Sequence, residues 1–195
     1  MEHYYSEQQK SLINIKKIKQ KIRGIGFEFY TASGVFSKEK VDNGTIVLAE
    51  NMLIPKNSNV LDIGCGIGIL GIVAAKLFNA NVVMSDINKR AVMLARRNIE
   101  LNNVKADIHQ GNLYEKINKN NFDVILSNPP QTAGKEICFK LIEQSKNYLK
   151  TGGILQLVAR HNKGGKTLSK KMEEVFGNVK VIAKKAGYWV YLSEK

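Results

Sequence analysis

The chain has 195 residues, 44% of them hydrophobic and 24% charged, a composition typical of one globular domain with a substantial core. No apolar run reaches membrane-spanning length, and the first ten residues, MEHYYSEQQK, contain no hydrophobic signal segment, so we expect a cytoplasmic protein without a membrane partner. The net charge of +13 favours a polyanionic partner such as RNA, although solubility alone would also account for it. Two cysteines and three histidines without metal-type spacing predict free thiols and no metal site.

The predicted elements divide the chain into an N-terminal section, residues 1–55, and an alternating section, residues 56–195. In the first section, residues 13–23 read INIKKIKQKIR, and their isoleucines follow neither the helical nor the strand period cleanly. Five residues of this segment are basic. The segment is therefore either a solvated edge strand or short helix, or a patch that faces RNA.

The alternating section predicts a mostly parallel sheet with helices on both faces, because strands and helices follow one another in turn. We expect one α/β domain whose sheet ends in an antiparallel C-terminal strand. The predicted strands are 59–63, 81–85, 106–110, 124–126, 154–159 and the terminal pair 179–183 and 188–192; the predicted helices are 69–78, 89–102, 136–149 and 167–176; a turn is predicted at 151–153.

A glycine-rich segment, LDIGCGIG at 61–68, follows the first of these strands and opens a helix. Gly64, Gly66 and Gly68 allow a sharp turn and the close approach of a ligand, which backbone amides at the start of the helix would face. The spacing is G-x-G-x-G and not the G-x-G-x-x-G of dinucleotide-binding folds. Asp62 beside this turn would repel a pyrophosphate but suits a cation, such as the amino group of a methionine moiety.

The next two strand ends complete a candidate cofactor site. Asp86 lies about two dozen residues beyond the glycine turn, where an acid accepts hydrogen bonds from ribose hydroxyls; taken alone it would equally be a helix N-cap. Asn112 follows the third strand and is placed to meet an adenine amino group. This order predicts S-adenosylmethionine, with an NAD-type dehydrogenase as the alternative. The candidate cofactor-binding residues are Asp62, Gly64, Cys65, Gly66, Gly68, Asp86, Ile87, Asn112, Leu113 and Asn128.

Two of the three prolines stand together in Asn128-Pro129-Pro130, after the fourth strand. Ligands bind beyond the carboxyl ends of strands in such sheets, so we expect this tripeptide in the pocket. Two prolines fix two φ angles and remove two donors, which leaves a rigid turn of acceptors. Acceptors that hold the N–H groups of a planar amine turn its lone pair toward a methyl donor without a strong base, so catalysis rests on positioning and electrostatics. The three residues are our candidate catalytic residues; the alternative is a purely structural turn.

Asn-Pro-Pro at this place resembles the motif of class I methyltransferases that act on the amino groups of adenine, guanine or glutamine. Those enzymes often have an aromatic residue next, which stacks on the target. This chain has Gln131 there instead, which counts against the DNA adenine and protein glutamine interpretations.

Further segments extend the resemblance to nearly the whole chain. TASGVFS at 31–37, VDNGT at 41–45 and HYYSE at 3–7 resemble the T-x-x-GVFS, D-x-G-T-x-x-L and HYFSE segments of the small-domain, RsmC-type methyltransferases, and TAGK at 132–135 is similar to their archaeal single-domain branch. The resemblance implies a Rossmann-like fold with a β-rich N-terminal extension (1–55) on the substrate side. It also implies an S-adenosylmethionine-binding core (56–195). The candidate substrate-binding residues are Phe36, Thr45, Gln131 and Lys135, with Phe36 or Tyr30 in place of the missing aromatic.

For function, the resemblance implies methylation of guanine N2 in small-subunit rRNA, either naked or in an assembling subunit. Basic residues near predicted strand ends would hold phosphates: Lys135, Arg160, Lys163 and Lys166. Two alternatives stay open. One is a protein glutamine N5-methyltransferase, and the other is an RNA-binding module that keeps the fold without the activity.

Overall fold

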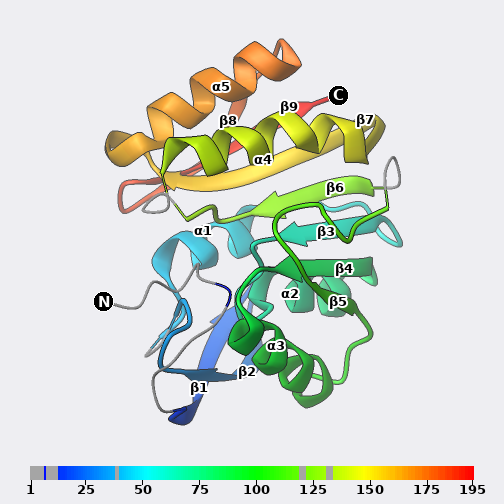
Figure 1. The fold of residues 1–195 in the computed structure, drawn as a ribbon, viewed down its shortest axis with the longest axis vertical. Coiled ribbons are helices and arrows are strands. Elements are labelled where there is room, and N and C mark those ends of the chain that lie inside the picture. The colour runs from blue at the N-terminus through cyan, green and yellow to red at the C-terminus, as the bar shows by residue number, and fades with distance from the viewer. Residues whose placement is uncertain (1–6, 8–12, 38–39, 119–121, 131–133) are drawn as a thin grey trace.

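The computed structural model describes residues 7, 13–37, 40–118, 122–130 and 134–195. It contains a seven-stranded sheet in the order β5-β4-β3-β6-β7-β9-β8 and a separate hairpin, β1-β2 (Figure 1). The strands are β1 (Ile15–Ile22), β2 (Ile25–Ala32), β3 (Asn59–Ile63), β4 (Asn81–Asp86), β5 (Asp107–Gln110), β6 (Phe122–Ser127), β7 (Leu149–Arg160), β8 (Lys180–Lys185) and β9 (Tyr188–Glu194). The helices are α1 (Asn43–Asn51), α2 (Ile69–Phe78), α3 (Lys89–Leu101), α4 (Lys135–Tyr148), the π-helical turn η2 (His161–Gly165) and α5 (Lys166–Phe176).

The sheet confirms the predicted fold class. β3 to β7 run parallel to one another, and β9 enters antiparallel between β7 and β8. β3 and α2 begin and end at the predicted residues, and the other elements of the alternating section differ by one or two residues, except for β7. The predicted period and turn signals therefore locate this part of the fold correctly.

The turn predicted at 151–153 is wrong, because these residues lie within β7. Gly152 has a φ of 74°, and its N–H donates to the Lys195 carbonyl at 2.8 Å. The Lys195 N–H in turn donates to the Gly153 carbonyl at 2.9 Å, and the register between β6 and β7 shifts here. The two glycines thus form an irregularity within β7. The sheet tolerates it because Lys195, the residue after β9, pairs with the Gly152 N–H and the Gly153 carbonyl.

Helices cover both faces of the sheet, as expected for parallel strands (Figure 1). Alternate residues of β3 face the two layers: Val60 belongs to the buried cluster shared with α1, α2 and α3, and Leu61 to the cluster shared with α4 and α5. No helix in the described ranges combines the length and apolar character needed to cross a bilayer.

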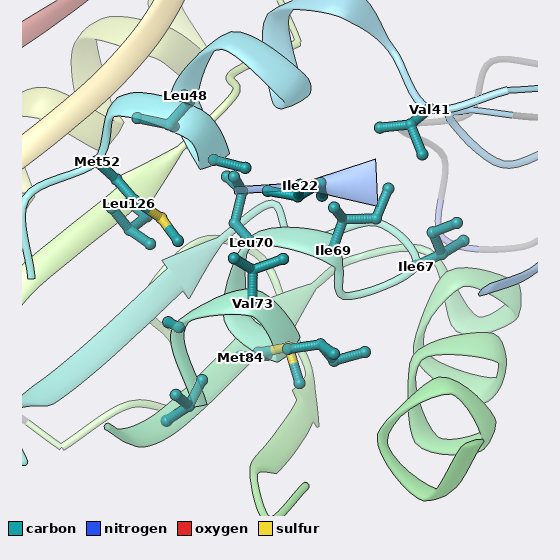
Figure 2. Close-up of a cluster of buried hydrophobic side chains, with 14 of the residues drawn as sticks. Ile22, Val41, Leu48, Met52, Ile67, Ile69, Leu70, Val73, Met84 and Leu126 are labelled. Atoms are coloured by element: carbon teal, nitrogen blue, oxygen red, sulfur yellow. The ribbon is translucent and has the colours of Figure 1, made fainter. Parts of the chain in front are cut away.

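The N-terminal section is part of the larger of these clusters. Residues 13–23 contain β1, so the short-helix alternative is wrong for this segment, and α1 was not predicted from the sequence. Figure 2 shows Ile22 from β1 and Leu48 from α1 beside Leu70 of α2. On the neighbouring side, the Asn98 amide of α3 bonds the backbone of β2 at Tyr30 in both directions, at 2.6 and 3.0 Å. These contacts fix the hairpin and α1 against the sheet's helical layer.

Candidate active site

A cavity of about 280 Å³ lies at the carboxyl ends of the central parallel strands. Residues at or just after the ends of β3, β4, β5, β6 and β7 line it, together with the residue before α1 and the first residue of β9. This is the place where open α/β sheets bind ligands. The lining is Phe36, Asp42, Ile63, Gly64, Gly66, Ser85, Asp86, Ile87, Ala91, Gly111, Asn112, Leu113, Asn128, Pro129, Pro130, Ile137, Leu141, Ala159, Arg160 and Tyr188.

The glycine turn after β3 lines the cavity with bare backbone. Gly64 and Gly66 have φ angles of 68° and 56°, which favour glycine, and a Cβ at either position would meet no atom within 4 Å. The Gly64 N–H donates to the Ser85 carbonyl of β4 at 2.9 Å. The turn is thus held by the neighbouring strand while its outer side remains open for a ligand.

Asp86 ties this turn to the end of β4. Its Oδ2 accepts from the Gly66 N–H at 2.7 Å and its Oδ1 from the Asn88 N–H at 2.8 Å. The helix cap considered from the sequence is instead Asn88, whose side chain accepts from the amides of Arg90 and Ala91 at the start of α3. Burial raises the pKa of Asp86, although the N–H donors oppose the rise. Each carboxylate oxygen keeps a lone pair for a ligand in the cavity that Asp86 lines.

Asp62 has an unsatisfied oxygen. Its Oδ2 accepts from the Gly71 N–H at 3.0 Å, whereas its Oδ1 is the one buried side-chain polar atom without a partner among the described residues. Burial raises the pKa of Asp62 to about 7; the Gly71 N–H lowers it and the Asp86 charge raises it further. With Cys65, Asp62 lines a second, smaller cavity that shares Gly64 with the main one. A buried carboxylate with a free oxygen is suited to a cationic ligand group.

The turn after β5 brings Asn112 and Leu113 to the main cavity. Leu113 has a φ of 51°, and its carbonyl accepts from the Ser85 hydroxyl at 3.1 Å, which fixes the turn to β4. The Asn112 N–H donates to Glu115, and its exposed side chain lies at the cavity. Ile87 lines the same cavity.

The Asn128 side chain is held in one orientation by the N-terminal section. Its Nδ2 donates to Thr45 Oγ1 at 2.9 Å and to Asp42 Oδ2 at 3.1 Å. Asp42 Oδ2 also accepts from the backbone N–H groups of Gly44 and Thr45 at the start of α1. We call Asp42, Thr45 and Asn128 the amide clamp. Because a flip of the amide would set its oxygen against Asp42 Oδ2, a carboxylate oxygen that can only accept, the Asn128 oxygen stays directed away from Asp42, and the described part of the chain offers it no donor.

The two prolines continue from a fixed strand end. The buried Ser127 hydroxyl donates to the Ile63 carbonyl at 2.8 Å, which joins the ends of β6 and β3. Pro129 is buried and Pro130 half-buried, and both line the cavity beside Asn128. The tripeptide is therefore a rigid wall of acceptors at the pocket.

The remaining predicted residues are divided among several places. Phe36 lines both cavities, and Thr45 lines the smaller one from within the amide clamp. Gly68 precedes α2 and Lys135 is an exposed residue at the start of α4; both lie outside the two linings. Gln131 lies outside the described residues.

Two side chains that contact the amide clamp or the cavity, Asp42 and Tyr188, were not selected from the sequence. Asp42 lies in the D-x-G-T segment, which carried the signal, but only Thr45 was selected from it. Tyr188 contributes from β9, where its hydroxyl lies 3.5 Å from Asp42 Oδ1 and its ring lies under the Arg160 guanidinium at 5.1 Å. No local pattern marks Tyr188, because its place depends on the insertion of β9 beside β7.

Comparison with known proteins identifies relatives whose sequences match most of this chain. The uncharacterized protein YbxB of Bacillus subtilis is 36% identical over 198 residues, covering 100% of this chain and 98% of YbxB. The ribosomal RNA small subunit methyltransferase C of Hamiltonella defensa is 30% identical over 97% of this chain, which spans only 56% of that relative. A putative protein N5-glutamine methyltransferase of Methanocaldococcus jannaschii is 33% identical over 72% of this chain and 81% of that protein.

Among solved structures, the 16S rRNA N2 methyltransferase RsmC of T. thermophilus, in complex with AdoMet and guanosine, superposes with a TM-score of 0.82 at 26% identity. The match covers 95% of this chain and 51% of that one, so this chain spans about half the length of its RsmC relatives. The model of the methyltransferase small domain matches residues 26–192. The chain therefore belongs to the methyltransferase small domain family.

Proposed function

We propose that this chain is an S-adenosylmethionine-dependent RNA methyltransferase that modifies guanine N2 in small-subunit rRNA. The observation that carries the proposal is the amide clamp, which fixes the Asn128 oxygen as an acceptor at the cavity beside two prolines. Such an acceptor suits a planar amine, which has N–H donors and no basic lone pair.

The methyl donor is S-adenosylmethionine: the chain belongs to a methyltransferase family, and the RsmC relative is described in complex with AdoMet. The residues fit this molecule. The free oxygen of Asp62 suits its ammonium group, Asp86 suits its ribose hydroxyls, and Asn112 suits its adenine amino group. When bound, it supplies a methyl group on a sulfonium sulfur, which a nucleophilic nitrogen can attack.

Asn128 acts on the target amine through position. Its oxygen accepts one N–H bond, and a backbone carbonyl of the Asn-Pro-Pro wall accepts the other, so the nitrogen lone pair is directed out of the plane of these bonds. No general base is required at the nitrogen, because methylation makes the amine acidic and its proton then leaves to water. Asp42 contributes by preventing Asn128 from presenting its NH₂ group instead, and Thr45 contributes a second acceptor for that NH₂ group.

RNA is supported as the substrate by the net charge of +13 and by the relatives of the RsmC type. A guanine in folded RNA has to leave its stack to reach Asn128. Unstacking costs a few kcal/mol, roughly, which favours an unpaired or loosely paired target.

A second candidate is protein glutamine N5-methylation. It is favoured by the M. jannaschii relative, because this chain covers 81% of that protein but only 56% of the H. defensa RsmC relative. A glutamine amide is also a planar amine and would meet the same clamp. Strong salt dependence of substrate binding would favour RNA over this candidate.

The deciding experiment offers labelled S-adenosylmethionine with unmodified small-subunit rRNA, assembled subunits, tRNA and release factor in parallel. We expect label in rRNA, recovered as N2-methylguanosine, and its loss by at least about a hundredfold in Asn128→Ala, since a positioned acceptor is worth roughly 10²–10³ in rate. Label in the protein substrate would replace the proposal by the glutamine candidate. Full activity of Asn128→Ala, with intact cofactor binding, would remove the role assigned to its side chain.

A further inference from the structure

Aromatic and basic side chains gather beside the cavity, at the ends of β7, β8 and the start of β9. Arg160 and Tyr188 line the cavity itself. Next to them, the His161 ring stacks on Trp189 with centroids 3.4 Å apart and planes 13° apart, and Lys184 Nζ lies 4.1 Å from the Trp189 ring centroid. We call the following residues the β7–β9 rim: Arg160, His161, Lys163, Lys184, Lys185 and Trp189.

Strand order places the rim at the same edge of the sheet as the active site. β7 and β8 end at this edge, and the antiparallel β9 begins there. The β8–β9 turn has positive φ at Ala186 and Gly187, 49° and 78°, typical of a two-residue hairpin turn. The His161 N–H donates to the Gly187 carbonyl at 3.0 Å, so η2 and the hairpin are joined by backbone. In Figure 1 the red hairpin and the orange start of α5 lie on the side where β3 and β6 end.

The cations of the rim are available to an external anion. Arg160, Lys163, Lys184 and Lys185 are exposed, and within the described ranges none of them forms an ion pair. On the basic strand β1, two of the four lysines, Lys17 and Lys19, are instead paired with Glu28. Partial burial and the nearby Lys166 and Lys184 charges lower the pKa of His161.

We propose that the β7–β9 rim binds the RNA strand next to the target nucleotide, with its cations on the phosphates and the His161–Trp189 stack supporting one flanking base. This inference rests on the proposed RNA methyltransferase function. Alternating cations and aromatic rings match the alternation of phosphate and base along a single strand. Because Arg160 and Tyr188 belong to the cavity wall, a strand that places one base in the cavity passes directly onto the rim.

The test compares two double variants that change the net charge of the protein by the same amount. Lys184→Glu with Lys185→Glu changes the rim, whereas Lys105→Glu with Lys180→Glu changes exposed lysines before β5 and at the start of β8, at the opposite edge of the sheet. The probe is a fluorescein-labelled single-stranded RNA that contains guanosine, titrated by anisotropy over a series of KCl concentrations. S-adenosylmethionine affinity, measured by calorimetry, serves as the check that both variants keep the fold.

We expect the slope of log Kd against log salt to fall by about 0.7 for each phosphate that the rim variant no longer neutralises, and to stay near the wild-type slope in the opposite-edge variant. Trp189 is the only tryptophan of the chain, so its fluorescence should change at the RNA concentration where the anisotropy rises. If the wild-type protein binds and methylates RNA, either of two results would overturn this inference and leave the proposed function standing. One is an equal salt slope in the two variants, and the other is an unchanged Trp189 fluorescence on RNA binding. A wild-type protein that methylates only a protein substrate would overturn the proposed function first and the inference with it.

Discussion

Asp42 uses one carboxylate for two structural tasks. Its Oδ2 caps α1 by accepting from Gly44 and Thr45, and the same atom holds the amide of Asn128. An ordinary helix cap contributes about 1 kcal/mol to stability. In the proposed function, the cap at this position also sets which side of the Asn128 amide would meet the substrate, so we expect the start of α1 to affect methyl transfer.

Thr45 is the residue at which positioning can be separated from stability. Thr45→Val keeps the shape of the side chain but removes the 2.9 Å hydroxyl acceptor of Asn128. The absence of one hydrogen bond of about 1–1.5 kcal/mol should lower kcat about tenfold and leave S-adenosylmethionine affinity unchanged. Thr45→Ser, which keeps the hydroxyl, is the matched control and should restore most of kcat. A wild-type kcat in Thr45→Val would mean that Asp42 alone orients the amide.

At the scale of elements, the start of α1 is packed against β9 at Gly44. A Cβ there would lie 2.9 Å from Asp42 Oδ2 and 2.9 Å from the Tyr188 ring. Alanine favours a helix over glycine by about 1 kcal/mol, so propensity alone predicts that Gly44→Ala stabilises the protein. We expect the steric clash to dominate, because it displaces a clamp residue and a cavity wall.

Methyl transfer and thermal unfolding of Gly44→Ala test this expectation. The variant should lose activity at least about tenfold and gain no stability. Gly26→Ala is the control, since a Cβ at Gly26 meets nothing within 4 Å. Unchanged activity together with a higher Tm would show that Tyr188 moves aside without consequence.

The sequence predicted elements well where the pattern is local. β3, the glycine turn and α2 follow one another within twenty residues, and each has its own period or turn signal. α1 was missed because it is a short helix of nine residues, and β7 was predicted too short because glycines usually end strands. The long-range contacts of the site have no such signal: Asn128 meets Asp42 across 86 positions, and Tyr188 meets it across 146.

For the whole molecule, buried Asp62 and Asp86 predict a stability that depends on pH. Their pKa values are raised in the folded protein, to about 7 for Asp62, so the folded state binds more protons than the unfolded state above pH 4 or so. The free energy of unfolding should therefore fall as pH rises from about 4 to about 7, by up to about 4 kcal/mol from Asp62.

Chemical denaturation of wild type and Asp62→Asn across this range measures the effect. The difference between the two curves isolates Asp62 from the opposite contribution of His161, whose pKa is lowered. S-adenosylmethionine should bind the wild type more tightly as pH rises toward 7, with release of a proton, because its ammonium group pairs with the ionised Asp62. Parallel pH profiles for the two proteins would mean that Asp62 titrates normally.

The position of β9 also predicts the order in which the pocket forms during synthesis. β8 is made before β9, yet β9 is its only neighbour in the sheet of the described residues. In a growing chain, β8 is therefore synthesised before its pairing partner. It can join the sheet only after β9 has been made and has paired between β7 and β8. Tyr188 is the first residue of β9, so among the described residues the cavity wall is complete only when β9 is in place. We therefore expect nascent chains to contain the glycine turn and Asn-Pro-Pro early, and to transfer methyl groups only after β9 has entered the sheet.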